Sequence, residues 1–571
     1  MLFCVLIGYI YSHECIHRLI QPKLTPYPKS NYTLDGHKIL NRKPIRVLFN
    51  YEMFDKDALQ CKKAGEYINW SFGNVMCREE DILTEEKRKI LIETFESMKD
   101  LLSNLINITR RRKAKIVSGK ILDINVPVKT YNNIDLLITL AIRPFGSSPI
   151  NAASFIGSLG EDNRPTVGGI YINPAVIPSN SQNITSLNRD YFMIVLHETF
   201  HILGLTDSLY EFWTNRETND VYGSDIMKIS YDDKGKKFYV LQTPILEKWA
   251  RDKYGEVPNG LPNGVFLEDG GGSGTSFAHP KGSFYYNDIM VGVSLTGQVL
   301  SDLTLTMLEA TGWYYTNFDY AEHLIWGTGI SFQYHPLYEY FPKNYYCNGE
   351  AQNSLTIAPD YSGPAICSGM SKVASCSSQT LNKDDAAFCN YEYYYNPYKY
   401  STRGTNNVFD YIQFKVIKER NYCFNPSHQT TKYGEYYGDN SVCAFSTLSK
   451  DENIETKAPR CYKMYFKENE LYINVDDIEA KCSYENEEIK FASYNGVVYC
   501  PDPHTLSRVF QSHNQTFSIP DRYFITKLSR IHLVLIICGS LLFVLIITII
   551  VIAILSRNKN EETDIIRQVL I

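Results

Sequence analysis

The pentapeptide HETFH at residues 197–201 constrains the fold of this chain more than any other feature. Its neighbours from Met193 to Leu203 are almost all apolar, so a helix at this place is apolar nearly all round and must be buried. Residues four apart lie on one face of a helix, so the two imidazoles point the same way. Buried imidazoles need polar partners, because an unpaired polar group in an apolar environment costs free energy. The pattern predicts a buried helix over residues 189–203 that carries a two-histidine site.

Two histidines at this spacing are typical zinc ligands, and Glu198 beside the first of them can reach a metal-bound water. Zinc lowers the pKa of such a water to about 7, and a carboxylate can take its proton as the water attacks a peptide carbonyl. His197 and His201 are therefore candidate ligands of one Zn²⁺ ion per chain, with Glu198 as the general base. The predicted reaction is hydrolysis of peptide bonds without a covalent intermediate.

A catalytic zinc ion usually has three protein ligands, and the sequence offers two candidates for the third. Asp207 lies three residues after Gly204, close behind the second histidine. His279 lies much further along the chain, just after the glycine-rich stretch of residues 269–276. Met290 follows in the sequence NDIM, where a turn beneath the metal is plausible on spacing. The residues by themselves leave both candidate ligands open.

Cysteines and glycosylation signals indicate the secretory pathway. Fourteen cysteines in 571 residues are typical of an oxidising compartment, and Cys61 and Cys77 are candidates for a local disulfide. Nine more lie within residues 346–527, and because nine is odd, one of them has no partner within that group. A net charge of −6 gives no field strong enough to hold nucleic acid, so we expect no nucleic-acid partner. The candidate N-glycosylation sites are Asn31, Asn69, Asn107, Asn183 and Asn514.

The two ends of the sequence predict targeting to a membrane. Residues 2–11 are apolar but too few to cross a bilayer, so we expect a signal peptide over residues 1–12. Residues 533–555 carry no charge, and about 20 apolar residues suffice to cross the hydrocarbon core. We therefore expect a transmembrane helix over 531–555 and a cytoplasmic tail over 556–571. The charged tail argues against a cleaved lipid-anchor signal. The expected topology is single-pass type I, at the cell surface or in a secretory-pathway membrane.

Apolar periodicity predicts several further elements. Apolar side chains at steps of three and four predict a helix within residues 79–113, and the basic residues 110–113 suit its C-terminus. Short β-branched runs predict strands over 134–142 and 167–172. The glycine-rich stretch 269–276 is expected to be an exposed loop. Together these elements predict an α+β fold, followed by a module rich in cysteine and tyrosine.

From about Ile45 to Trp326 the chain resembles the leishmanolysin family of cell-surface zinc metallopeptidases. The blocks that carry the resemblance are Cys77 with EDILT and EKR within residues 80–88, then HETFHILGL, LEDGGGSGTS, NDIM, and ATGWY at residues 310–314. The resemblance implies a metzincin-type catalytic domain in which the third zinc ligand follows a long insertion. It favours His279 over Asp207. The site residues it implies are the zinc ligands His197, His201 and His279, the base Glu198 and the Met-turn residue Met290.

The resemblance extends to the N-terminal segment. In the family, a prodomain cysteine flanked by histidines blocks the zinc, and HECIH at residues 13–17 is similar, although Arg18 replaces a usual acid. This implies that Cys15 is a cysteine switch within a short pro-segment, residues 13–43. The alternative is an ordinary pro-segment cysteine. A second departure from the family pattern is Pro280, which stands where an aromatic residue commonly follows the third histidine.

The expected organisation follows from these assignments. Between the pro-segment and the membrane helix we expect an N-terminal catalytic subdomain (44–205), a central subdomain (206–345) and a Cys/Tyr-rich module (346–527). The predicted function is that of a membrane-anchored zinc endopeptidase acting on proteins or peptides, with no oligomeric state predicted. The alternatives are a catalytically silent adhesion or receptor protein on the same fold, an exopeptidase, and a structural zinc protein. The intact HETFH argues against a silent protein, and three histidines plus water would leave an open position that a structural site lacks.

Overall fold

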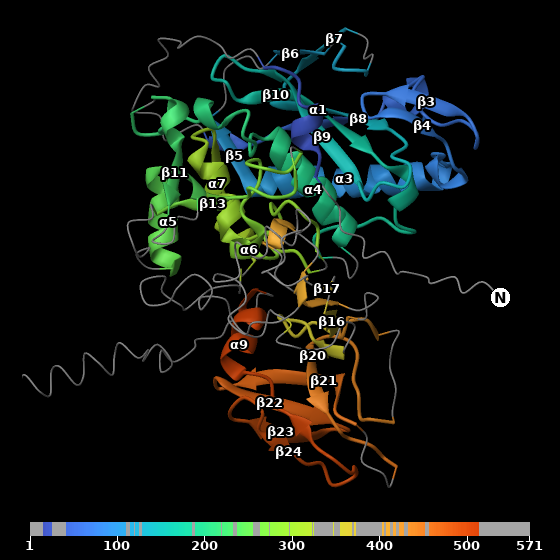
Figure 1. The fold of residues 1–571 in the computed structure, drawn as a ribbon, viewed down its shortest axis with the longest axis vertical. Helices are drawn as coiled ribbons and strands as arrows, with labels where there is room; N and C mark the ends of the chain where they lie inside the picture. Colours follow the sequence, from blue (N-terminus) through green and yellow to red (C-terminus); the bar gives the residue numbers. More distant parts are fainter. Residues whose placement is uncertain are drawn as a thin grey trace, which may run out of the picture. The chain divides into compact units, whose positions relative to one another are not determined.

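A computed structural model gives the arrangement of the chain (Figure 1). The chain divides into two compact units, residues 1–517 and 518–571, and all the described residues fall in the first. The structure describes residues 15–24, 42–109, 115–118, 120–124, 128–185, 189–218, 220–231, 237–254, 263–272, 274–295, 297–322, 324, 347, 355–367, 370–372, 402–404, 407–410, 415–417, 422–426, 432–451 and 456–512. The predicted signal peptide and the predicted membrane segment 531–555 lie outside these residues.

A four-stranded sheet organises the catalytic part. Its order is β2 (Val47–Asn50), β8 (Leu136–Ile142), β10 (Pro165–Ile172) and β9 (Ala152–Leu159), with β9 as an antiparallel edge strand on an otherwise parallel sheet. All seven residues of β8 are buried, as expected for a strand covered on both faces. The strands predicted over 134–142 and 167–172 are thus confirmed, each to within about two residues at its ends.

The two faces of the sheet are covered by different parts of the chain. Ile138 and Leu140 face a core that includes helices α3 (Glu85–Leu105) and α4 (Asp190–Ile202), which Figure 1 shows along the sheet. Leu137 and Ala141 point to the other side, where they pack with the Cys61–Cys77 disulfide and β3 (Tyr67–Trp70). The alternation follows from the two-residue period of side chains along a strand.

Helix α3 ends earlier than its apolar pattern predicts. Thr84 caps its N-terminus by accepting a hydrogen bond from the Lys87 amide, and the last helical residue is Leu105. The prediction that the basic residues 110–113 close the helix is wrong, because the β-branched sequence that follows forms strand β5 (Ile106–Thr109). This strand pairs on both sides, with β1 (Arg42–Pro44) and β14 (Tyr314–Thr316), so tertiary pairing overrides the helical pattern.

The part of the chain that follows α4 carries smaller elements. Strands β11 (Met227–Tyr231), β12 (Lys237–Leu241) and β13 (Val265–Leu267) form one antiparallel sheet. The other helices that the structure describes are α1 (His17–Ile20), α2 (Met53–Lys56), α5 (Pro244–Tyr254), α6 (Gly282–Tyr285), α7 (Asp302–Ala310) and α9 (Pro503–Ser512). The short 3₁₀ helices are η2 (Glu79–Asp81), η3 (Pro174–Val176), η4 (Tyr210–Phe212), η5 (Gly223–Ile226), η6 (Phe318–Tyr320) and η8 (Asn407–Phe409).

The described residues after 346 form mainly strands. A six-stranded sheet has the order β23-β22-β21-β20-β25-β24, and smaller sheets after residue 346 join β15-β16-β19 and β17-β18. The hairpins β3-β4 and β6-β7 belong to the catalytic part of the chain. The bounds of these strands are β4 (Gly73–Met76), β6 (Lys115–Ser118), β7 (Lys129–Asn132), β15 (Leu355–Ile357), β16 (Pro364–Cys367), β17 (Met370–Lys372), β18 (Thr402–Gly404), β19 (Lys415–Ile417), β20 (Ser441–Ser446), β21 (Ala458–Lys467), β22 (Glu470–Val475), β23 (Ile478–Cys482), β24 (Glu488–Ile489) and β25 (Val498–Tyr499).

The disulfides agree with the cysteine spacing. Cys61 pairs with Cys77 as predicted, and the module contains Cys347–Cys367, Cys423–Cys461 and Cys482–Cys500. Cys443 is buried beside the Cys423–Cys461 bond as a thiol. Among the described cysteines after residue 346 it is the one outside a disulfide, and Cys376 and Cys389 lie outside the described residues.

Two further predictions concern exposure. Of the candidate glycosylation sites, Asn69 and Asn183 are exposed and Asn107 is half-buried in β5, whereas Asn31 and Asn514 lie outside the described residues. The glycine-rich stretch has no helix or strand in its described part, but its second half, Gly274 to Ser276, is buried rather than exposed. None of the helices in the described ranges is long and apolar enough to cross a membrane.

Candidate metal centre

Helix α4 places the first two histidines. It spans Asp190–Ile202, which confirms the predicted helix, and every residue from Tyr191 onward is buried. The turn after the helix contains Gly204, whose φ of +114° favours glycine and whose Cβ position would lie 2.7 Å from the Trp313 ring. The turn brings the carbonyl oxygen of Leu205 to 2.6 Å from Nδ1 of His201. The short HETFHILG sequence thus positions both a ligand and the group that orients it.

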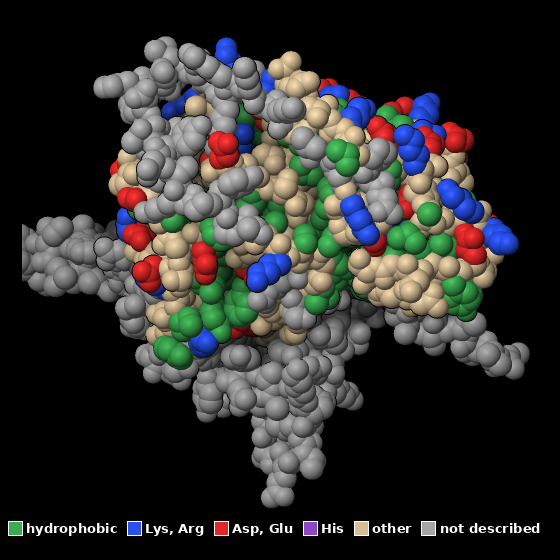
Figure 2. All heavy atoms as spheres, turned by 90° about the horizontal axis from the view of Figure 1, so that it is seen from above, with side chains coloured by type: hydrophobic (Ala, Val, Ile, Leu, Met, Phe, Trp, Pro, Cys, Tyr) green, Lys and Arg blue, Asp and Glu red, His purple; other side chains and the backbone are tan. Residues whose placement is uncertain are grey.

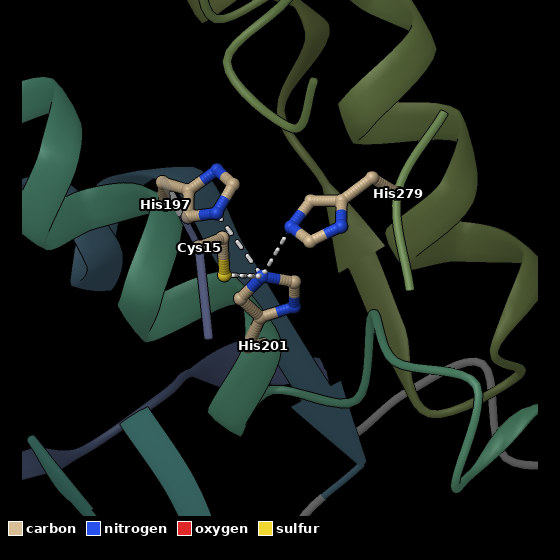
Figure 3. Close-up of side chains that lie close together, drawn as sticks. All are labelled: Cys15, His197, His201 and His279. Carbon is tan, nitrogen blue, oxygen red and sulfur yellow. Dashed lines mark hydrogen bonds between the residues drawn. The ribbon is translucent and has the colours of Figure 1, made fainter. Parts of the chain in front are cut away.

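Three imidazoles and a thiol converge on one point (Figure 3). Nε2 of His201 lies 3.0 Å from Nε2 of His197 and 3.1 Å from Nε2 of His279. The sulfur of Cys15 lies 3.4 Å from the same nitrogen of His201. All four side chains are buried, and their ligand atoms lie within 4.8 Å of one another. Figure 2 shows basic and acidic side chains interspersed on one outer face, whereas this cluster lies inside the molecule.

The second ring nitrogen of each histidine fixes which nitrogen faces the cluster. Nδ1 of His197 lies 2.6 Å from the carbonyl oxygen of Ile289, and Nδ1 of His279 lies 2.7 Å from that of Thr275. His201 is held in the same way by Leu205. A carbonyl oxygen only accepts hydrogen bonds, so each Nδ1 carries the proton and each neutral ring directs an Nε2 lone pair inward.

Three inward lone pairs cannot satisfy one another. They accept and do not donate, so a cation between them is the group that fits this donor set. Burial, followed by the nearby rings of His17, His197 and His279, lowers the pKa of His201 well below its usual value, which keeps the ring neutral as a metal ligand requires. A buried set of three imidazoles whose Nε2 atoms face one point suits zinc in both ligand type and number.

Glu198 is fully buried next to this cluster. Its Oε2 accepts a hydrogen bond from the Ser154 hydroxyl at 2.5 Å, and its Oε1 lies 4.0 Å from the sulfur of Cys15. Ser154 lies on the edge strand β9, so the sheet orients the carboxylate. Ser154 could not be predicted from the sequence, because a serine within a strand has no spacing relation to HETFH.

The turn around Met290 orients the His197 ring through a backbone carbonyl. Met290 is buried, and the preceding carbonyl, that of Ile289, accepts the His197 hydrogen bond. Asp288 shapes the turn, since its carboxylate accepts hydrogen bonds from the Met290 amide at 2.8 Å and from the hydroxyls of Ser301 and Thr304. Burial raises the pKa of Asp288 to about 6. Asp288 is a supporting residue that lies within NDIM but that the sequence did not single out.

The two candidates for the third ligand occupy different positions. His279 is in the converging set, and Asp207 is not, among the described residues. Pro280, the departure from the family pattern, lies in a bridge opposite Leu267. Its neighbours carry the backbone hydrogen bonds there, from the Glu268 amide to His279 and from the Lys281 amide to Phe266. Proline is tolerated at this place because its missing N–H is not needed.

The segment around Cys15 lies across the cluster. The His17 ring stacks on the His201 ring at 4.5 Å, and its Nδ1 lies 2.7 Å from the carbonyl oxygen of Ser154. Gln21 pairs with the edge strand β9 through both the amide and the carbonyl of Ile156, at 2.9 and 3.1 Å. The Thr275 hydroxyl donates to the carbonyl of Cys15 at 3.0 Å.

The glycine-rich loop leaves room for the segment around Cys15, because Gly274 has no side chain. A Cβ at Gly274 would lie 3.1 Å from the carbonyl oxygen of Cys15 and 3.2 Å from Cα of Ile16. The second half of the loop is therefore buried because it packs backbone to backbone against the N-terminal segment. Sequence composition indicates that such a loop lacks regular structure, but not what covers it.

Comparison with known proteins agrees with this geometry. The model of the leishmanolysin family matches residues 23–505. Leishmanolysin of Leishmania chagasi is 24% identical over 55% of this chain and 56% of its own length, and that of Leishmania major is 26% identical over 50% and 45%. A leishmanolysin-like peptidase of Drosophila pseudoobscura pseudoobscura is 23% identical over 60% and 58%. The chain thus spans about half the length of these relatives. Because the family model covers most of the sequence, the chain belongs to the leishmanolysin family.

Proposed function

We propose that this chain is a zinc-dependent endopeptidase that hydrolyses peptide bonds of proteins or peptides. The observation that carries the proposal is the convergence of three inward Nε2 atoms beside a buried carboxylate. His197, His201 and His279 would hold one zinc ion, which when bound supplies Lewis-acid chemistry at a peptide carbonyl. Membership of the leishmanolysin family supports the same activity.

The roles of the protein groups follow from their contacts. Glu198 is the group that accepts a proton from the attacking water, and it can pass that proton to the leaving amine. The hydrogen bond from Ser154 leaves Oε1 of Glu198 as the oxygen that faces the cluster, 4.0 Å from the sulfur of Cys15. Met290 is proposed as the Met-turn residue, because its turn holds the carbonyl that orients His197.

Metal content tests the ligand set together with the activity. We expect wild-type protein to contain one zinc and to cleave a fluorogenic peptide library, with activity removed by a chelator and restored by zinc. His279→Ala should lose most of the bound zinc, whereas Asp207→Ala should keep it, because two protein ligands seldom hold catalytic zinc. The measurement is elemental analysis of the purified variants. Loss of zinc in the Asp207 variant alone would overturn the assignment of His279.

We also propose a membrane anchor and a latent precursor. The uncharged residues 533–555 support a single-pass type I topology, with the catalytic part at the cell surface or in the secretory-pathway lumen. The sulfur of Cys15 lies 3.4 Å from Nε2 of His201, among the proposed zinc ligands, which supports the cysteine switch.

Fractionation tests the anchor. We expect the full-length protein to sediment with membranes and to resist carbonate extraction, whereas a chain that stops at Lys527 is secreted. The difference follows from the cost of exposing a long apolar segment to water. Recovery of the full-length protein in the soluble fraction would contradict the anchor without touching the proposed chemistry.

A further inference from the structure

The loop that carries His279 is closed at its base by a buried lysine. Lys281 follows His279 by two residues, and its side chain is only 2% exposed. Its Nζ lies 2.5 Å from Asp269, 3.0 Å from Asp410 and 3.7 Å from Glu268. Glu268 and Asp269 belong to the start of the same loop, so the ion pairs join its two ends. Asp410 comes from a distant part of the chain.

Residues 407–410, which we call the clasp, pack against both ends of this loop. A Cβ at Gly270 would lie 2.6 Å from the carbonyl oxygen of Asn407, and one at Gly282 would lie 2.7 Å from that of Val408. Asn407 also accepts a hydrogen bond from the Gly271 amide at 3.1 Å. The backbones meet so closely that neither glycine has room for a side chain. Separate contacts therefore hold the clasp at the loop's base.

Buried carboxylates from both the loop and the clasp surround Lys281 at this base. The Glu268 carboxylate is fully buried and accepts hydrogen bonds from the amides of Gly270 and Gly282 at 2.7 and 2.9 Å. Asp410 is buried as well and accepts a hydrogen bond from the Ser283 hydroxyl. Of the three carboxylates beside Lys281, only that of Asp410 comes from the clasp, because Glu268 and Asp269 belong to the loop itself. Loss of the Asp410 charge should therefore disturb Lys281 and the loop ends with it.

The loop has little rigidity of its own. Its glycines restrict the backbone weakly, so contacts at its base set its shape. The same loop supplies the Thr275 carbonyl that orients His279. A change at the base is thus transmitted to the ring over a few residues.

We propose that Asp410 and Lys281 are positioning residues for His279, so that the clasp, which lies more than a hundred residues further along the chain, is a working part of the metal centre. The inference rests on the proposed function, since it takes His279 to be a zinc ligand. Outer residues that orient metal ligands typically change metal affinity by about 10- to 100-fold when they are replaced.

The test compares two aspartates of the C-terminal module in the full-length protein. Asp410→Asn keeps the shape and removes the charge, whereas Asp451→Asn does the same at a side chain that is 60% exposed and 3.0 Å from Lys432. We expect Asp410→Asn to lose zinc to a chelator about 10- to 100-fold faster than wild type, and Asp451→Asn to change the rate less than about 2-fold. Equal rates for both variants would overturn the proposal.

A double-mutant cycle separates positioning from general loss of stability. If Asp410 acts through His279, then Asp410→Asn should not weaken residual zinc binding any further in a His279→Ala background. If Asp410→Asn weakens zinc binding by a similar factor in wild type and in His279→Ala, its effect is a general destabilisation, and the proposal is overturned. Should Asp410→Asn fail to fold, Asn407→Ala removes the acceptor of the Gly271 amide and should speed zinc loss in the same direction. An unchanged rate in Asn407→Ala would then count against the clasp.

The result for wild type separates this inference from the proposed function. Wild-type protein without stoichiometric zinc would reject both. One zinc in wild type, together with wild-type behaviour of Asp410→Asn, would reject the clasp alone and leave the ligand set intact.

Discussion

Replacing Glu198 by glutamine should lower kcat for peptide hydrolysis by about 10²- to 10⁴-fold, the range typical of a lost general base. An amide has nearly the shape of the carboxylate but cannot accept the proton of the attacking water. The Ser154 hydroxyl can still donate to the amide oxygen, so the side chain should keep its place. We therefore expect unchanged zinc content and an unchanged Tm, with the loss confined to kcat.

A nearby glutamate provides the control. Glu211→Gln makes the same chemical change at an exposed position shortly after α4, and kcat should stay within about 2-fold of wild type, as for other surface changes. The measurement is kcat and KM on one peptide from the library, with zinc content determined on the same preparations. More than a tenth of wild-type activity in Glu198→Gln would reject its role as the base.

The part of the site on helix α4 is predictable because its residues lie close together in the sequence. HETFH sets the helical face, and the apolar neighbours from Met193 to Leu203 require burial, so His197, Glu198 and His201 follow from one short sequence. His279 is different, because no periodic pattern relates it to α4 and the resemblance to a family was needed to prefer it over Asp207. The structure brings it to the cluster by way of β13 and the loop that follows.

The remaining supports of the site arise only from tertiary contacts. Ser154 reaches Glu198 because β9 is the edge strand beside α4, and Asp410 reaches Lys281 across more than a hundred residues. The two wrong predictions, the C-terminal end of helix α3 and the exposure of the glycine-rich loop, have the same origin. Helix α3 stops where Ile106–Thr109 finds strand partners on both sides, and the glycine-rich loop is buried where the N-terminal segment covers it. A local sequence pattern does not show which distant strands pair with β5 or which segment covers the loop.

The N-terminal segment yields the other large expected effect. We expect the precursor that keeps residues 13–43 to be inactive and Cys15→Ser to be active without trimming. The thiol lies 3.4 Å from Nε2 of His201 and could fill the position that the attacking water needs, whereas a hydroxyl is a much weaker zinc ligand than a thiolate. Activity should rise strongly over that of the wild-type precursor, because the coordination position that the attacking water needs is then open. Initial rates on purified precursor, with N-terminal sequencing to verify that the segment is present, provide the measurement.

Cys443 offers the matched control for this latency, because it is the other thiol among the described cysteines and lies in strand β20. Cys443→Ser should leave the precursor latent, and mercurials should activate it as they activate wild type, since the thiol they must reach is Cys15. The contacts of His17, Gln21 and Thr275 should keep the segment near the cleft even in Cys15→Ser, so that trimming still raises its activity modestly by clearing β9. A precursor that retains Cys15 and cleaves peptide as fast as the trimmed form would reject the switch, while the three histidines and Glu198 would remain the proposed catalytic centre.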